Sequence, residues 1–386
     1  MSKAIGFMKK EAVLCVALLL AVLSAGIVPP DQEYAEYIDA RTLAILFCLM
    51  SVMAGLQKIG IFGWIARGLL GKVKGSRSLV LVLMLLCFFS SMLITNDVAL
   101  ITFVPFTFTV LAMMGQETRQ RLALPLVAKQ TIAANLGSML TPIGNPQNLY
   151  LYGKAGMSLG SFLALMLPYA VVSLLLLLVW GVFLGGMRAG ELEPLAEDLG
   201  GREPERFRSK AGMLSLWVYL VLFLLCLLTV AHVLPWQVVL GIVLAAVLAM
   251  DRKLLAKVDY SLLLTFVGFF IFIGNVGRIP AFRDFLQKVV VGREVYAGVA
   301  ASQVISNVPA ALLLSGFTED YGRLVVGVNL GGLGTLIASM ASLISYKYVA
   351  KEESAGRGAY IKVFTVSNIC FLAALMVFDG LWKHSF

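Results

Sequence analysis

Long apolar stretches, each about as long as a bilayer is thick, dominate this sequence. Runs such as 171–180 and 216–230 are apolar on every face, and a helix of that kind lies in lipid or in a large protein core. About 20 such residues span a bilayer as a helix, and the chain supplies that length many times. Its 386 residues are 60% hydrophobic and 14% charged, against about 45–50% and about 25% in soluble domains. These features predict an all-α polytopic membrane protein.

The charged residues and cysteines argue against other classes of site. The net charge is +9, but the Lys and Arg residues lie between apolar runs, where the positive-inside bias places them. No nucleic-acid partner is therefore expected. The five cysteines lie in separate apolar runs, and the only histidines are His232 and His384. This pattern predicts no zinc site, iron–sulfur cluster or disulfide framework, and hence no metal or cofactor beyond a coupling Na⁺ or H⁺.

Loop charges predict how the chain crosses the membrane. Residues 29–40 carry only acidic charges until Arg41, which places them outside, whereas residues 58–77 carry five basic residues and no acid, which places them in the cytoplasm. We expect nine crossings of the cell (inner) membrane, with a cytoplasmic N-terminus and an extracytoplasmic C-terminus. The spanning segments are expected at residues 11–28, 41–58, 123–152, 159–185, 213–232, 236–250, 260–277, 324–346 and 362–380.

Two further apolar stretches, 78–114 and 294–317, are each interrupted by a polar tip, at 94–98 and 305–309 respectively. The arms of the second stretch hold about ten residues each, which as helix reach only about half of a 30 Å hydrocarbon core. This length predicts a re-entrant hairpin. Since the two halves of the chain match, we expect the first stretch to be a re-entrant hairpin as well, although its arms are long enough to span the membrane fully.

Four matches in the same order indicate an internal repeat. The crossing count gives the two copies opposite orientations, so we predict inverted repeats, a feature of many secondary transporters. The predicted division is a first repeat at 1–185, a cytoplasmic linker at 186–212, a connecting transmembrane helix at 213–234 and a second repeat at 235–386. The matches are Thr95-Asn96-Asp97 with Ser306-Asn307-Val308, Asn135-Leu-Gly with Asn329-Leu-Gly, Thr141 with Thr335, and the segments 54–62 with 273–282.

Each repeat is also expected to contain a broken transmembrane helix. Two prolines and a glycine interrupt residues 141–148, and glycines and hydroxyls interrupt residues 331–342. Irregular backbone survives at membrane depth only where protein or water surrounds it. Helix N-termini at such breaks suit an anion, whereas amides, hydroxyls and carbonyls suit Na⁺. The predicted substrate-binding residues are Thr95, Asn96, Thr141, Gly144, Asn145, Asn148, Ser306, Asn307 and Thr335.

Asp97 is the one carboxylate expected deep inside an apolar segment. A charge at the bilayer centre costs about 2.5–3.5 kcal/mol on insertion scales, so such a residue is a functional candidate. It could take up a proton, bind a cation, pair with Lys129 or cap a helix that begins at Val98. We assign the coupling ion to Asp97, together with Asn96 and Asn307.

These motifs resemble the ion-transporter superfamily, which includes arsenite/antimonite permeases, related Na⁺/H⁺ antiporters, citrate permeases and divalent-anion/sodium symporters. The matching motifs are residues 95–100, 141–148 and 306–310. The resemblance implies two hairpin tips that meet two broken helices at the membrane midplane, a homodimer formed through a scaffold domain, and elevator-like motion. In the divalent-anion symporters both tips read Ser-Asn-Thr; the Asp97 here is more similar to the arsenite-permease branch, which implies proton coupling.

The predicted function is secondary active transport, by alternating access, of a small inorganic or organic anion or oxyanion of the dicarboxylate, citrate or arsenite type, coupled to H⁺ or Na⁺. The alternative is a Na⁺/H⁺ antiporter on the same scaffold, with Asp97 as the shared site. A third hypothesis, an intramembrane enzyme, requires paired acids, a metal-ligand cluster or a nucleophile–base pair, and Asp97 stands almost alone. We therefore expect that the protein is not an enzyme.

Overall fold

The computed structural model describes residues 11–70, 73, 75–185, 209–353 and 356–383, and within them the regular structure is helical. The predicted linker at 186–212 lies mostly outside the described residues. The helices are α2 Ala12–Ala25, α3 Glu33–Tyr37, α4 Ala40–Ile59, α5 Ile61–Leu70, α6 Ser76–Ile94, α7 Asn96–Met113, α8 Gln116–Ser138, α9 Pro146–Lys154, α10 Leu159–Gly185, α13 Lys210–Val230, α14 Trp236–Asp251, the 3₁₀ helix η1 Arg252–Lys257, α15 Tyr260–Gly277, α16 Pro280–Val290, α17 Glu294–Ile305, α18 Asn307–Leu314, α19 Tyr321–Leu330, α20 Met340–Glu352 and α21 Arg357–Lys383.

Seven of the described helices are long and apolar enough to cross a membrane, namely α4, α6, α7, α10, α13, α15 and α21. Large apolar side chains such as Leu175, Val221 and Val366 are exposed on their outer surfaces, as lipid contact requires. Not all nine predicted crossings are single helices long enough to span a bilayer. Helices α2 and α14 have only 14 and 16 residues. Two other predicted spans, 123–152 and 324–346, are each broken into two helices. The chain is an all-α polytopic membrane protein.

Both predicted helix breaks are confirmed. The segment 123–152 forms α8 and α9, because Pro146 can start a helix but has no N–H with which to continue one. The segment 324–346 forms α19 and α20, with the glycine-rich residues 331–335 between them. Both breaks therefore leave the N-terminus of a second half-helix inside the protein.

Both interrupted stretches form helical hairpins. Thr95 is the only residue between α6 and α7, and Ser306 is the only residue between α17 and α18. The arms of the second hairpin have 12 and 8 residues, too few to cross the roughly 30 Å hydrocarbon core as helices. The arms of the first have 19 and 18 residues and are long and apolar enough to cross a membrane, so the re-entrant character of this hairpin stays a prediction.

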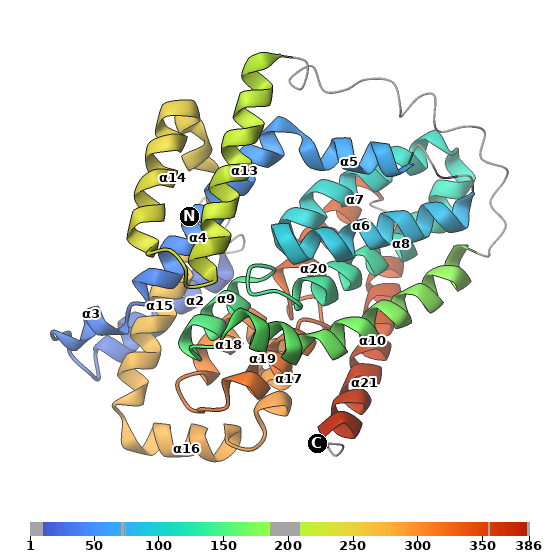
Figure 1. Ribbon diagram of the computed structural model, residues 1–386. Coiled ribbons are helices and arrows are strands. Elements are labelled where there is room, and N and C mark those ends of the chain that lie inside the picture. The colour runs from blue at the N-terminus through green and yellow to red at the C-terminus, as the bar shows by residue number, and fades with distance from the viewer. Residues whose placement is uncertain (1–10, 71–72, 74, 186–208, 354–355, 384–386) are drawn as a thin grey trace, which may run out of the picture.

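The helices pack in two groups. A flanking group contains α2, α4, α13, α14 and α15, and a central group contains α6–α10 and α17–α21. Figure 1 shows α4, α13 and α14 on one side of the molecule and α6, α8, α10 and α21 on the other. The groups touch where α9 meets α4 and where α18 meets α15. The candidate site lies beside this boundary.

The amphipathic helices α5 and α16 run along opposite edges of the molecule (Figure 1). In α5, Phe62 and Ala66 are buried while Trp64 and Leu69 are exposed, so one stripe of the helix packs against protein and the other faces outward. This placement is what inverted repeats require, although the inverted relationship itself stays a prediction.

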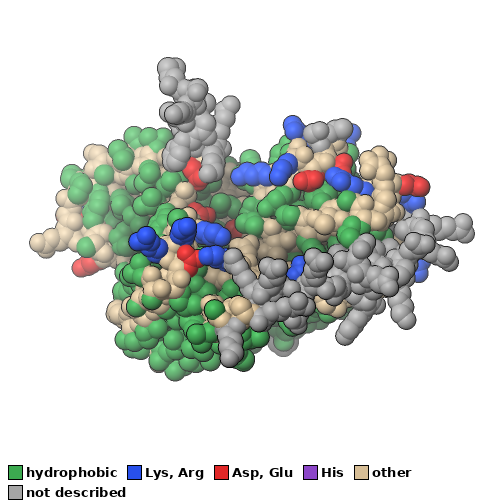
Figure 2. Space-filling model, turned by 90° about the horizontal axis from the view of Figure 1, so that it is seen from above, with side chains coloured by type: hydrophobic (Ala, Val, Ile, Leu, Met, Phe, Trp, Pro, Cys, Tyr) green, Lys and Arg blue, Asp and Glu red, His purple; other side chains and the backbone are tan. Residues whose placement is uncertain are grey.

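Basic side chains gather on the edge of the molecule that carries α5 (Figure 2). On the helix ends near this edge, Lys58 pairs with Asp251, and Arg119 Nε lies 2.7 Å from Glu353 Oε1. The face in Figure 2 is hollowed, and acidic side chains lie in the hollow. The positive-inside bias predicts that this face is cytoplasmic.

Candidate functional site

The tip of the first hairpin is a strained turn. Thr95 has φ 69° and ψ 151°, and positive φ is unusual for a β-branched residue. Its hydroxyl accepts the Val98 N–H over 3.5 Å, so Thr95 caps α7 and the predicted capping role of Asp97 is wrong. The Asn96 N–H donates to the Gly144 carbonyl over 3.2 Å. Residues held in such conformations cluster at functional sites.

The tip of the second hairpin repeats this geometry. Ser306 has φ 73° and ψ 155°, and the Asn307 N–H donates to the Ala338 carbonyl over 2.9 Å. Gly144 and Ala338 each immediately precede the residue that caps the second half-helix of their break. Each tip is therefore hydrogen-bonded to the break in its own half of the chain.

Thr141 and Thr335 hold the breaks to the hairpins. Thr141 Oγ1 donates to the Met92 carbonyl over 2.5 Å, and Thr335 Oγ1 donates to the Gln303 carbonyl over 3.2 Å. Met92 and Gln303 each lie three residues before a hairpin tip. Both hydroxyls, predicted to bind substrate, are thus used in positioning the backbone.

Asparagine side chains connect the two halves at the centre of the site. Asn145 Nδ2 donates to Asn329 Oδ1 over 3.4 Å, and Asn329 Nδ2 donates to Asn148 Oδ1 over 2.6 Å. In the opposite direction, Ser339 Oγ donates to Asn135 Oδ1 over 3.0 Å. The second half-helix of each break therefore contacts the asparagine of the Asn-Leu-Gly pattern in the other half. These residues are almost fully buried.

The hairpin tips reach the same network. Asn96 Nδ2 donates to Asn135 Oδ1 over 3.0 Å, and Asn135 Nδ2 donates to the Gly332 carbonyl over 3.4 Å. A Cβ at Gly332 would lie 3.1 Å from Asn307 Nδ2, which places the second tip beside this break. The structure thus brings both predicted tips and both predicted breaks together.

Three residues of the network were not predicted as site residues: Asn135, Asn329 and Ser339. The signal for the first two was present, because both asparagines belong to the repeated Asn-Leu-Gly pattern. The signal for Ser339 was its position four residues after Thr335, which matches the position of Asn145 after Thr141.

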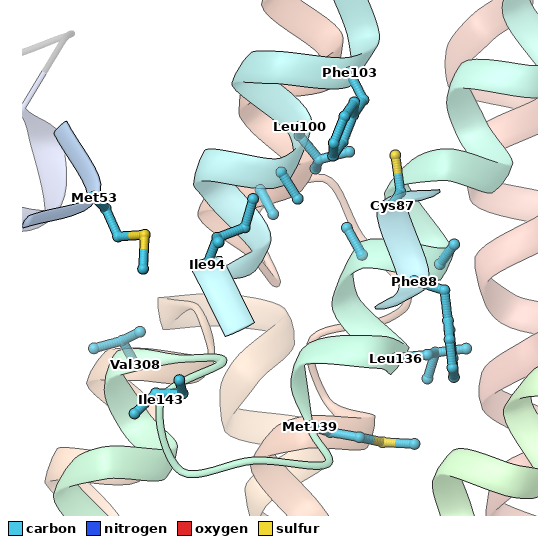
Figure 3. Packing of buried hydrophobic residues seen from close by; sticks show 14 of the residues in the cluster. Met53, Cys87, Phe88, Ile94, Leu100, Phe103, Leu136, Met139, Ile143 and Val308 are labelled. Carbon is cyan, nitrogen blue, oxygen red and sulfur yellow. The ribbon is translucent and has the colours of Figure 1, made fainter. Parts of the chain in front are cut away.

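Apolar side chains surround the network. Val308 occupies in the second tip the position that Asp97 occupies in the first, and Figure 3 shows Val308 beside Ile143 from the first break. Ile94 of the first tip is also buried there. The carboxylate is therefore present on one side of the site only, and its counterpart is an apolar contact.

Two oxygen atoms at the site, Asp97 Oδ1 and Asn145 Oδ1, are buried and have no hydrogen-bond partner among the described residues. Both residues line a cavity of about 570 Å³. Its opposite wall comes from the flanking group, through Met50 and Met53 of α4 and Asp259 at the start of α15. The cavity therefore lies between the two helix groups and reaches the first tip.

Lys129 does not form the proposed ion pair with Asp97. Its Nζ lies 5.0 Å from the centroid of the Trp180 ring and 3.4 Å from the Trp180 carbonyl oxygen. Two other carboxylates are more deeply buried than Asp97, which is half-buried: Asp379 of α21 is 2% exposed and pairs with Arg323, and Glu294 at the start of α17 is 5% exposed. Asp97 is thus not the only acid inside the apolar part of the chain.

The residues that the structure describes contain no group of three or more His, Cys, Asp or Glu side chains that could hold a metal ion.

Helices that can cross a bilayer, two hairpins and two broken helices around a buried polar centre define a multi-pass membrane protein of the transporter class. A profile described as "Citrate transporter" matches residues 6–320. The chain belongs to this citrate transporter family, and the resemblance to the ion-transporter superfamily is confirmed.

Relatives of this chain include bacterial, archaeal and plant membrane proteins. It is 33% identical over 321 residues to the inner membrane protein YbiR of Escherichia coli, covering 82% of each chain. It is 32% identical over 344 residues to the uncharacterized transporter MJ0456 of Methanocaldococcus jannaschii, covering 89% of this chain and 90% of the relative. It is 34% identical over 154 residues to the silicon efflux transporter LSI3 of rice, covering 39% of this chain and 30% of the relative.

Proposed function

We propose that this protein is a secondary active transporter that moves a small anion or oxyanion across the inner membrane, coupled to H⁺ or Na⁺. The observation that carries the proposal is the asparagine network, in which Asn329 and Asn135 of opposite halves each bind the broken helix of the other half. A polar centre shared by two halves and bordered by a cavity is what alternating access through one site requires.

The proposal assigns separate roles to the parts of the site. The second half-helices α9 and α20 begin at the centre, and their N-terminal N–H groups and dipoles favour the negative charge of a substrate. Asp97 carries the coupling cation, because its Oδ1 and the Oδ1 of Asn145 leave two acceptor oxygens at the cavity. The two halves act as inverted repeats, so that the flanking and central groups open the site to each side in turn.

Uptake into proteoliposomes tests this function. The solutes to compare are citrate, dicarboxylates, arsenite, sulfate and, because one relative is named a silicon efflux transporter, silicate. We expect an inward Na⁺ or H⁺ gradient to drive accumulation of one of them, and Asp97→Asn to abolish that coupling. The proposal fails if neither gradient drives any of these solutes.

A Na⁺/H⁺ antiporter is the second candidate. It is favoured by the same two oxygen atoms of Asp97 and Asn145, because they suit a transported Na⁺ ion as well as a cation that drives anion transport. The distinguishing result is Na⁺-driven proton movement, measured with a trapped pH-sensitive dye, in the absence of any transported anion. Loss of that movement in Asp97→Asn would establish the antiporter.

A further inference from the structure

The cavity beside the first hairpin tip has a second carboxylate on its opposite wall. Asp97 and Asn145 line it from the central group, and Asp259 lines it from the residue that precedes α15. The other ionisable side chains that line this cavity are Glu11, Lys257 and Tyr260.

An independent feature of the cavity points to a positively charged ligand. Asn145 is 3% exposed and lines this space, and its buried Oδ1 has no hydrogen-bond partner among the described residues. Its Nδ2 is already used, since it donates to Ser138 Oγ over 2.8 Å. An acceptor oxygen buried without a donor is costly, and a bound cation would satisfy it.

Asp259 has a structural role that uses only part of its carboxylate. Its Oδ1 accepts the Leu262 N–H over 2.9 Å and so caps α15, whereas Oδ2 accepts no hydrogen bond from the described part of the chain. Asp259 is exposed, while Asp97 Oδ1 is buried. The two carboxylates therefore mark the solvent end and the buried end of one cavity.

The chain offers a matched residue for comparison. Asp39 caps α4 with φ −76° and ψ 82°, and Asp259 caps α15 with φ −78° and ψ 82°. Both accept the N–H of the residue three positions later, over 2.9 Å. Asp39, however, lines a different cavity, of about 340 Å³, together with Arg41 and Lys154. The two residues share a capping role and differ in the space they face.

We propose that Asp259 is a cation-exchange site at the solvent end of this cavity, which passes the coupling cation to and from Asp97. The cation is monovalent, H⁺ or Na⁺. A proton moves from one carboxyl group to the other carboxylate, or a Na⁺ ion moves between the two, so no other reactant is needed. The inference rests on the proposed function, in which Asp97 carries the coupling cation.

The test compares four full-length variants in proteoliposomes and in detergent: Asp259→Asn, Asp259→Glu, Asp97→Asn and Asp39→Asn. Uptake driven by Na⁺ at a fixed pH, and uptake driven by a pH gradient without Na⁺, identify the cation. Binding of ²²Na⁺ to the purified protein adds a readout that does not require transport. Asn caps helices as well as Asp does, so Asp259→Asn removes the charge and keeps the cap, whereas Glu restores the charge and caps poorly.

We expect Asp259→Asn to raise the half-saturating concentration of the coupling cation about fivefold, because one negative charge is lost from the cavity. The maximal uptake rate should stay within about twofold of the wild type at saturating cation. Asp259→Glu should restore the affinity, and Asp39→Asn should leave cation binding to purified protein unchanged.

Two results would overturn the inference. If Asp259→Asn binds and uses the cation as the wild type does, while Asp97→Asn is inactive, Asp259 is only a cap and the proposed function stands. If neither Na⁺ nor H⁺ drives uptake of any solute by the wild type, the proposed function falls and the inference with it. Should Asp259→Asn prove unstable, Asp259→Ser keeps a capping oxygen and is held to the same criteria.

Discussion

Asn329 Nδ2 donates to Asn148 Oδ1 over 2.6 Å, which joins the first half-helix of one break to the second half-helix of the other. Asn329 also donates to the Val325 carbonyl of its own helix over 2.8 Å. Both amide hydrogens are therefore committed, and the side chain acts as a fixed cross-brace. In the proposed function, the position of the substrate site depends on this cross-brace.

We predict that Asn329→Ala destabilises the protein and impairs transport. It leaves Asn148 Oδ1 buried without this donor, and an unsatisfied buried acceptor costs about 1–3 kcal/mol. Thermal unfolding in detergent should report the loss, and uptake should fall because α9 and α19 are no longer held together. A double-mutant cycle with Asn148→Ala should show non-additive losses, as residues in one hydrogen-bond network do.

The control for this experiment is Asn368→Ala. Asn368 is equally buried, but its Nδ2 donates only within its own helix, to the Phe364 carbonyl over 2.8 Å. We expect its removal to leave uptake by folded protein largely unchanged. Equal transport defects in Asn329→Ala and Asn368→Ala would show that the cross-brace has no special role.

The sequence predicted where the backbone breaks better than it predicted which side chains meet. Proline, glycine and the polar tips mark the breaks and hairpins because they prevent continuous helix locally. The pairing of Asn329 with Asn148 depends on how two distant segments pack, and no local pattern encodes it. The repeated Asn-Leu-Gly pattern still contained the necessary residues, Asn135 and Asn329.

It was harder to predict which charged side chains are buried than to predict where the helices break. Asp379 is followed by Trp382 and Lys383 in the sequence, residue types that are typical of a membrane interface. Its burial results from Arg323 and Tyr169, which belong to other helices. A carboxylate that is buried by tertiary packing in this way gives no periodic signal.

Close packing between each hairpin and its broken helix gives a second prediction. A Cβ at Gly137 would lie 2.0 Å from the Phe88 carbonyl oxygen, and one at Gly331 would lie 2.6 Å from Ser302 Oγ. Gly137→Ala should therefore cost about 1–3 kcal/mol through overpacking and lower the melting temperature. Gly331→Ala would also meet Ser302 Cβ at 2.7 Å, but its nearest backbone atom, the Gly298 carbonyl oxygen, is 3.0 Å away, so we expect a smaller loss than for Gly137→Ala.

Gly241→Ala is the control for the glycine variants. Gly241 lies inside α14, and a Cβ there would meet nothing within 4 Å. Alanine is favoured over glycine in a helix by about 1 kcal/mol, so this variant should be as stable as the wild type or more stable. A loss for Gly241→Ala as large as that for Gly137→Ala would contradict the packing argument.

The buried ion pair between Arg323 and Asp379 gives a third prediction. The two guanidinium nitrogens lie 2.8 Å from the two carboxylate oxygens, and Tyr169 Oη donates to Asp379 Oδ1 over 2.6 Å. Removing one partner of a buried pair leaves an uncompensated charge and costs about 3–5 kcal/mol. Arg323→Ala should lower the melting temperature strongly, and Arg323→Lys should recover only part, since lysine cannot form the bidentate contact.

An exposed pair provides the comparison for Arg323. Arg278 lies 2.7 Å from Asp31, and the two side chains are 37% and 39% exposed. Such pairs contribute about 0–1 kcal/mol, so Arg278→Ala should change the melting temperature little. If both arginine variants lost the same stability, burial would not explain the effect.

Chemical labelling tests the orientation of the chain and the side to which the cavity opens. In a variant without the five native cysteines, one new cysteine is placed at Ser261, which lines the 570 Å³ cavity, or at Glu36, which lines the 340 Å³ cavity. The loop charges place residues 29–40 outside and the basic face of Figure 2 inside. A membrane-impermeant maleimide added to intact cells should therefore label Glu36→Cys and leave Ser261→Cys unlabelled. Ser261→Cys should react once the membrane is permeabilised, and a saturating substrate that favours the opposite conformation should slow that reaction. Labelling of Ser261→Cys in intact cells, with Glu36→Cys protected, would reverse the predicted topology, because the positive-inside bias fixes both assignments together.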